Sequence, residues 1–271
     1  MSKSITTEGR IFARQVGREV KRRELVAASA ISNGNEKELW PAVKWIVGRL
    51  DADTSPVKRV ACLQAVAARL RSVPDGDRGA FVDISRFDGK RTCELMFTTL
   101  LADDHPMEAM TGLEAGITLQ CHYFKIGRTG PDLRVGVVAA YASAHALGRL
   151  YERARHQVEI SYGIGFLRLC GRAGVFASTD KRLWRTEINI ALNDDLVATG
   201  STRVAGQGDV AGTFFDCRTV LPRDACDGEQ IAQADGFAQV LEGKATVAEI
   251  PFLVRPNDFV LEKLKRFEEG S

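Results

Sequence analysis

The first part of the chain has apolar residues at a helical spacing. Over residues 8–27 an apolar residue recurs every fourth position while arginines recur in parallel on another side, which is the pattern of an amphipathic helix. Two more helices are predicted, one over 35–50, whose first residue is an asparagine that can cap it, and one from Pro56, because proline suits the first helical position. The Pro-Asp-Gly-Asp run at 74–77 breaks this series. Residues 1–78 are therefore predicted to form a helical N-terminal part.

Beyond residue 78 the pattern changes to that of β-strands. Apolar runs over 81–87 and 92–101 flank Asp88-Gly89, a dipeptide that favours the tight turn of a β-hairpin. Alternating or continuous apolar runs predict further strands over 117–123, 135–142, 184–192, 196–204 and 213–220. The last three are expected to form an antiparallel meander. Further helices are predicted over 143–176, 229–242 and 258–267.

Strands gathered together, with helices mainly before and after them, indicate an α+β fold with a largely antiparallel sheet and C-terminal helices. The predicted organisation is the helical N-terminal part over 1–78 followed by an α+β body over 79–271, and a single domain is the equal alternative. A chain of 271 residues can bury a hydrophobic core without the help of a metal or a disulfide.

Composition narrows the class of protein further. The six cysteines include no Cys-x-x-Cys pair and are expected to be free thiols in a reducing compartment. The first residues lack the apolar core of a secretory signal, and no run is long and apolar enough to span a bilayer, so we expect a cytoplasmic protein with no membrane partner. An organelle-targeting presequence is the alternative, but Glu8, Glu19 and Glu24 are residues that such segments avoid. Lys and Arg exceed Asp and Glu by only 37 to 35, so any polyanion site must be local.

The predicted helix at about 143–157 carries the residues best suited to chemistry. It follows a predicted strand and begins after Ser143, which is suited to the N-cap position. At 100° per residue its polar side chains lie within about 100° of arc. These side chains are His145, Arg149, Glu152, Arg153 and His156.

A histidine in the first helical turn favours the neutral imidazole, and the same turn attracts anions. His145 is therefore predicted to act as a catalytic acid or base, with Arg149 and Arg153 as phosphate-binding residues. An enzyme built in this way would be a metal-independent ribonuclease or phosphodiesterase-like hydrolase. The alternative is the ordinary solvated face of an amphipathic helix. No cofactor and no metal site are predicted, and Cys121 and His122, adjacent in a strand, should point to opposite faces.

The arginine row of the first helix is the second candidate site. Arg10, Arg14 and Arg18 recur every fourth residue and could neutralise the phosphates of a nucleic acid, which would make binding depend strongly on salt. The alternative is a solvated helix face or a helix packed on a partner chain.

Together these features predict a cytoplasmic protein that handles nucleic acid, in the first place RNA. Two other classes stay open. One is a non-catalytic interaction or assembly module with a protein partner or a homo-oligomer. The other is an enzyme that acts on a small molecule in a pocket built from distant residues. The sequence has no phosphate loop, no nucleophile elbow and no His-Glu-x-x-His pair that would decide between them.

Overall fold

A computed structural model describes residues 4–53, 55–103, 116–128, 130–154, 158–205 and 212–251. These residues form helices and a mostly antiparallel sheet, with helices at the beginning and toward the end of the described chain. The predicted α+β class is therefore confirmed. The helix predicted over 258–267 lies outside the described residues. No described helix has the length and apolar character needed to cross a membrane.

The three helices predicted for the first part of the chain are present. They are α1 (Thr7–Ser32), α2 (Leu39–Ala52) and α3 (Pro56–Ser72). The predicted start of α2 is wrong, because the helix begins after Glu38 and not after Asn35. Asn33 and Gly34 have positive φ angles of 58° and 79°, and the Asn35 side chain donates to the Ser32 carbonyl at 2.6 Å. Asn35 thus belongs to the turn that ends α1.

Seven strands form one sheet in the order β1-β2-β3-β4-β7-β6-β5. They are β1 (Ala80–Asp88), β2 (Thr92–Asp103), β3 (Gly116–Gly127), β4 (Gly130–Ser143), β5 (Glu187–Ala191), β6 (Leu196–Ala205) and β7 (Gly212–Pro222). The predicted hairpin turn is confirmed by Gly89, whose φ is 72°. β5 starts later than predicted because Arg185 has a φ of 57°, which is incompatible with an extended strand. The predicted meander β5-β6-β7 is antiparallel, whereas β4 and β7 run parallel.

The chain divides into two compact units whose boundaries fall inside α1, β4 and α6 (Ile160–Thr179). The amino-terminal unit is Arg14–Val138 with Glu159–Leu167. The carboxy-terminal unit is Met1–Ala13, Ala139–Val158 and Arg168–Ser271. Most of the predicted helical part therefore shares a unit with β1, β2 and β3.

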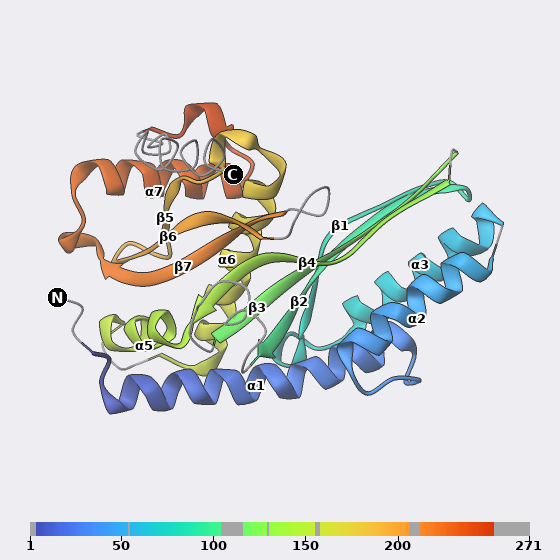
Figure 1. Ribbon diagram of the computed structural model, residues 1–271, viewed down its shortest axis with the longest axis horizontal. Helices are drawn as coiled ribbons and strands as arrows, with labels where there is room; N and C mark the ends of the chain where they lie inside the picture. Colours follow the sequence, from blue (N-terminus) through green and yellow to red (C-terminus); the bar gives the residue numbers. More distant parts are fainter. Residues whose placement is uncertain are drawn as a thin grey trace, which may run out of the picture. The chain divides into compact units, whose positions relative to one another are not determined.

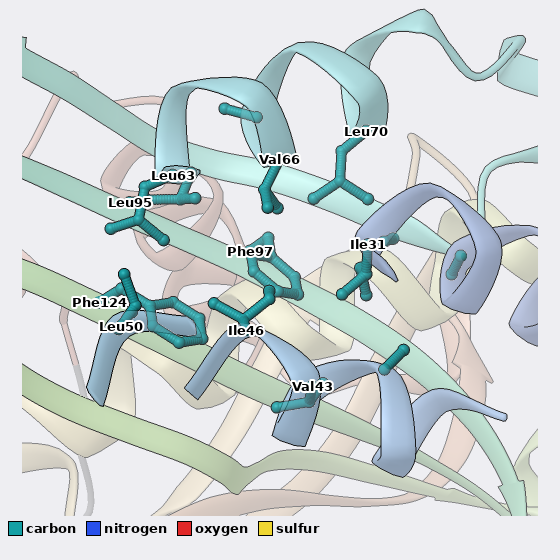
Figure 2. Packing of buried hydrophobic residues seen from close by; sticks show 14 of the residues in the cluster. Ile31, Val43, Ile46, Leu50, Leu63, Val66, Leu70, Leu95, Phe97 and Phe124 are labelled. Atoms are coloured by element: carbon teal, nitrogen blue, oxygen red, sulfur yellow. The ribbon is translucent and has the colours of Figure 1, made fainter. Parts of the chain in front are cut away.

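The core of the amino-terminal unit lies between the helices α2 and α3 and the strands β1 to β3 (Figure 1). Figure 2 shows apolar side chains of the helices pointing toward Leu95, Phe97 and Phe124 on the strands. The rings of Phe97 and Phe124 are stacked with their centroids 5.8 Å apart. The helical members shown are Ile31, Val43, Ile46, Leu50, Leu63, Val66 and Leu70. Burial of these residues fixes which faces of the helices remain available to ligands.

The carboxy-terminal unit contains α5 (Ala144–Arg153), the larger part of α6 and α7 (Gly228–Leu241). Asp227 caps α7 by accepting from the Gln230 amide at 2.8 Å, and the Gln230 side chain accepts from the Asp227 amide in return. Gln233 of α7 accepts from both the backbone and the side-chain nitrogen of Asn189 on β5. Helix α7 is thereby fixed against the edge strand of the sheet.

Candidate functional site

Helix α5 begins as predicted from the sequence. The Ser143 hydroxyl accepts a hydrogen bond from the Ala146 amide at 3.1 Å, which confirms Ser143 as the N-cap. His145 therefore lies in the first helical turn, and it is half-buried. His156, the second histidine of the predicted face, lies outside the described residues.

The polar face of α5 packs against the beginning of the chain, within the carboxy-terminal unit. A Cβ added to Gly9 would lie 3.0 Å from the Gly148 carbonyl oxygen, so the two backbones approach closely. The rings of Phe12 and Tyr151 are stacked at 5.1 Å, and the Thr6 amide donates to the Glu152 carboxylate. Glu152 of the predicted polar face is thus covered by the first residues of the chain, and His145, Arg149 and Arg153 beside it are half-buried.

Arg149 and Arg153 both hold protein acceptors in this packing. Arg149 donates to Glu152 at 2.6 Å, and the two side chains are only 13% and 11% exposed. Burial raises the pKa of Glu152, but the hydrogen bonds from Thr6 and Arg149 outweigh it and lower that pKa overall. Arg153 donates to the Val220 carbonyl of β7, and burial lowers the pKa of its guanidinium. The phosphate-binding role of Arg149 and Arg153 stays a prediction. To bind phosphate, each arginine would have to release its present hydrogen-bond acceptor in the protein.

The arginine row of α1 has the opposite character. Arg10, Arg14 and Arg18 are exposed, and none of them forms an ion pair within the described part of the chain. The other side of the helix is fixed by apolar side chains that are almost completely buried, at Phe12, Val16 and Val20. Because the apolar side is buried, the three guanidinium groups are held on the exposed side of the helix.

The next arginines of α1 show how these residues differ from structural ones. Arg22 and Arg23 both donate to Glu19 at 2.7 Å, and Arg23 also donates to the Arg78 carbonyl at 3.1 Å. Hydrogen bonds from Arg22 and Arg23 lower the pKa of Glu19 to about 2. These two arginines hold the fold of the amino-terminal unit together, whereas Arg14 and Arg18 of the same unit do not.

Two tryptophans on α2 each lie beside a cation. The Lys44 Nζ is 5.4 Å from the ring centroid of Trp40, and the Arg49 Cζ is 5.3 Å from that of Trp45. Trp40 is 46% exposed, but its ring edge is seated against Gly136 of β4, where an added Cβ would lie 3.2 Å from it. Trp40 thus offers an exposed aromatic surface whose position is fixed by the backbone below it.

His122 of β3 is completely buried and has a structural role. Its Nδ1 accepts from the Gly136 amide at 3.1 Å, and its Nε2 lies 2.9 Å from the Thr99 hydroxyl. The ring also lies 5.1 Å from that of Phe97, on the side of the strand that faces the core. Burial lowers the pKa of His122 to about 3, so the imidazole is neutral at physiological pH.

The thiols of Cys93 and Cys121 are not activated nucleophiles. All six cysteines are free, as predicted. Burial raises the pKa of Cys93 to about 11, and burial with a smaller contribution from Asp83 raises that of Cys121 to about 12. A reactive cysteine would need the pKa to move in the other direction. Within the described ranges no group of three His, Cys, Asp or Glu side chains could hold a metal ion; His105 lies outside those ranges.

A further group of polar side chains, not predicted from the sequence, lies on the sheet of the carboxy-terminal unit. The strand register aligns Tyr141 of β4 with Asp216 of β7, Asp216 with Ser201 of β6, and Ser201 with Glu187 of β5. Two arginines of β6 and β7 contact this row. The Asp216 cluster, as we call it, consists of Tyr141, Glu187, Ser201, Arg203, Asp216 and Arg218.

Asp216 is the centre of this cluster. Its side chain is 3% exposed and lies 2.7 Å from the Arg203 Nε and 3.9 Å from the Arg218 Nε. Arg218 also donates to the Ser201 hydroxyl at 2.6 Å and lies 3.9 Å from Glu187. Burial raises the pKa of Asp216 although both arginines act to lower it. The signal in the sequence was a pair of charged residues, Asp216 and Arg218, within an apolar strand, since buried charges in proteins are rare unless paired.

Comparison of the chain with protein-family models, with curated proteins and with solved structures found no significant match.

Proposed function

We propose that the protein binds single-stranded RNA through the exposed face of α1 and the cation-flanked tryptophans of α2. The observation that carries the proposal is the row of exposed arginines without ion-pair partners in the described chain. Arg14 and Arg18 belong to the amino-terminal unit, while Arg10, one turn earlier on α1, falls in the segment Met1–Ala13 of the carboxy-terminal unit. Successive guanidinium groups are about 6 Å apart along the helix axis. One nucleic-acid strand following the helix would meet them in turn.

Arginine is well suited to phosphate because its planar guanidinium can donate two parallel hydrogen bonds and always remains charged. On the whole molecule positive and negative charges nearly balance, so long-range attraction is weak. Binding would therefore depend on this local row, and it would fall steeply as salt is added.

Trp40 favours a single strand as the ligand over a duplex. Unpaired bases stack on aromatic side chains, whereas the bases of a duplex are already stacked on one another. Lys44 beside the ring adds a positive charge where the sugar-phosphate chain of a stacked nucleotide would pass. No base-specific contact is proposed, so the sequence preference should be weak.

The contacts of α5 favour binding over hydrolysis. Cleavage by His145 would need Arg149 and Arg153 to leave Glu152 and the Val220 carbonyl for the scissile phosphate. We therefore propose RNA binding as the function. Incubating labelled RNA with the wild type and with His145→Ala tests the predicted cleavage separately.

The arginine row is tested by the triple variant Arg10→Ala, Arg14→Ala, Arg18→Ala. Fluorescence anisotropy with a labelled single-stranded RNA at several salt concentrations gives both affinity and salt dependence. Each lost phosphate contact should reduce the slope of log K against log salt by about 0.7, so the triple variant should lose about 2 in slope.

The matched control removes the same charge from the β1–β2 hairpin, through Arg86→Ala, Lys90→Ala, Arg91→Ala. These side chains are also exposed. The control should bind RNA with nearly the wild-type slope. Equal loss in both triple variants would mean that only total charge matters, and unchanged binding in the α1 variant would refute the proposal.

Base stacking is tested by Trp40→Ala, with Trp184→Ala as the control because Trp184 is comparably exposed, at 38% against 46%. Removing a stacking tryptophan costs about 1–3 kcal/mol per base. The Trp40 variant should therefore bind single-stranded RNA at least about fivefold more weakly. A Trp40 variant that binds like the wild type would restrict the interaction to phosphates.

A further inference from the structure

The Asp216 cluster has buried polar groups beneath exposed charged groups. Asp216, Ser201 and Tyr141 are almost completely buried. The side chains of Arg203, Arg218 and Glu187 are 36%, 50% and 67% exposed. All six residues of the cluster belong to the carboxy-terminal unit, whereas Arg14, Arg18 and Trp40 of the RNA proposal belong to the amino-terminal unit.

Both arginines are held in position from below. The same oxygen of Asp216, Oδ2, lies 2.7 Å from the Arg203 Nε and 3.9 Å from the Arg218 Nε, so the buried carboxylate attracts both guanidinium groups. Ser201 accepts from one terminal nitrogen of Arg218 and fixes the direction of that side chain. Two adjacent guanidinium groups repel each other, and the buried carboxylate is what allows them to stay together.

Hydrogen-bond donors remain unused in this arrangement. Two guanidinium groups face one buried carboxylate, and the second negative charge of the cluster, Glu187, lies at its exposed rim 3.9 Å from Arg218. Among the described residues Asp216 is the only acceptor near Arg203, and its Oδ2 lies 2.7 Å from the Nε, so both terminal nitrogens of Arg203 are left as donors. The Glu187 carboxylate lies 3.9 Å from Arg218, which is too far for a hydrogen bond.

We propose that the Asp216 cluster binds a phosphate group, held between Arg203 and Arg218. A phosphate offers three oxygens and a negative charge to the unused N–H groups of the two arginines. Asp216 is then a positioning residue that attracts both guanidinium groups. The negative charge of Glu187 repels the phosphate and so lowers its affinity. The phosphate can come from a small phosphate ester or from the backbone of a nucleic acid.

The test uses the full chain and inorganic phosphate as the probe, at constant ionic strength. Calorimetry gives the affinity, and the rise in melting temperature with phosphate provides an independent measure because a ligand of the folded state stabilises it. Arg218→Met removes one guanidinium while Arg203 stays with Asp216, and should weaken phosphate binding about tenfold or more. Arg182→Met is the control, since Arg182 pairs with Asp180 in the same unit and should have no effect.

Glu187→Gln gives a prediction of opposite sign. Removing its negative charge should raise the affinity for phosphate about twofold to threefold. A purely structural ion-pair network predicts no gain in this variant. Because Glu187 is mostly exposed, the variant should also fold.

Three further probes test the ligand and show whether its phosphate belongs to a small ester or to a nucleic-acid backbone. Acetate, with two oxygens, should bind more weakly than phosphate. The first outcome is that a phosphate monoester binds as tightly as inorganic phosphate and RNA without terminal phosphates does not compete, which identifies a small phosphate ester as the ligand. The second outcome is that this RNA competes with phosphate, which identifies the RNA backbone as the ligand. Either result supports the phosphate site. Unchanged phosphate affinity in Arg218→Met, or no gain in Glu187→Gln, would overturn it, and both outcomes are independent of the α1 variants.

Discussion

Lowering the pH below 6.5 should destabilise this protein through His122. The Gly136 amide donates to Nδ1, so the single proton of the neutral ring lies on Nε2 and is donated to the Thr99 hydroxyl. A second proton would have to enter at Nδ1. It would break the bond to Gly136 and leave a cation completely buried beside the Phe97 ring.

The size of the effect follows from the two pKa values. Burial lowers the pKa of His122 from its ordinary value of 6.5 to about 3. Between these values the unfolded chain binds a proton that the folded protein does not bind, so stability is complete above pH 6.5 and is lost as the pH falls. The loss amounts to about 1.4 kcal/mol at pH 5.5 and about 3 kcal/mol at pH 4.5.

Urea unfolding at pH 7.5, 6.5 and 5.5 measures this loss directly. His122→Gln is the informative variant, because its amide can still donate to Thr99 but does not titrate. It should be less stable than the wild type at pH 7.5 and should lose much less stability than the wild type by pH 5.5. Glu19, with a pKa of about 2, titrates outside this range. If both proteins lost stability in parallel, the buried neutral imidazole would not be the cause.

Three further variants, two on α6 and one on α7, test contacts that stabilise the fold. A Cβ added at Gly174 would lie 1.6 Å from the Ala139 carbonyl oxygen, so Gly174→Ala should destabilise the protein by about 3 kcal/mol or more. Gly165→Ala on the same helix meets no atom within 4 Å and should be neutral or gain up to about 1 kcal/mol, which urea unfolding will show. Gln233→Ala removes the acceptor of two Asn189 donors and should cost about 1–3 kcal/mol in the same assay, whereas no loss would mean that water replaces Gln233.

Much of the secondary structure could be predicted because its signals are local. The spacing of Phe12, Val16 and Val20 predicted both the helix and the face that the structure buries. The Asp88-Gly89 turn and the Ser143 cap need only a few neighbouring residues to form, and both were found where the sequence indicated them. The exposed arginine row of α1 was predictable for the same reason, since the opposite apolar face fixes its direction.

The surroundings of α5 could not be predicted in this way. The helix and its polar face were expected, but the partners of that face are distant in the chain. Thr6 donates to Glu152, and Arg153 donates to the carbonyl of Val220. A periodicity of 3.6 residues tells which side chains share a face, and it does not tell which segment covers that face.

By itself the sequence determined the α+β class, most helices and strands, and the arginine row of α1, because each depends on contacts between residues close in the chain. Only the tertiary structure placed Asp216 between Arg203 and Arg218 and beside Tyr141. That arrangement depends on the register of separate strands, including the parallel pair β4 and β7. Strand register is set by burial across the whole sheet, and the sequence of one strand does not specify which strands lie beside it.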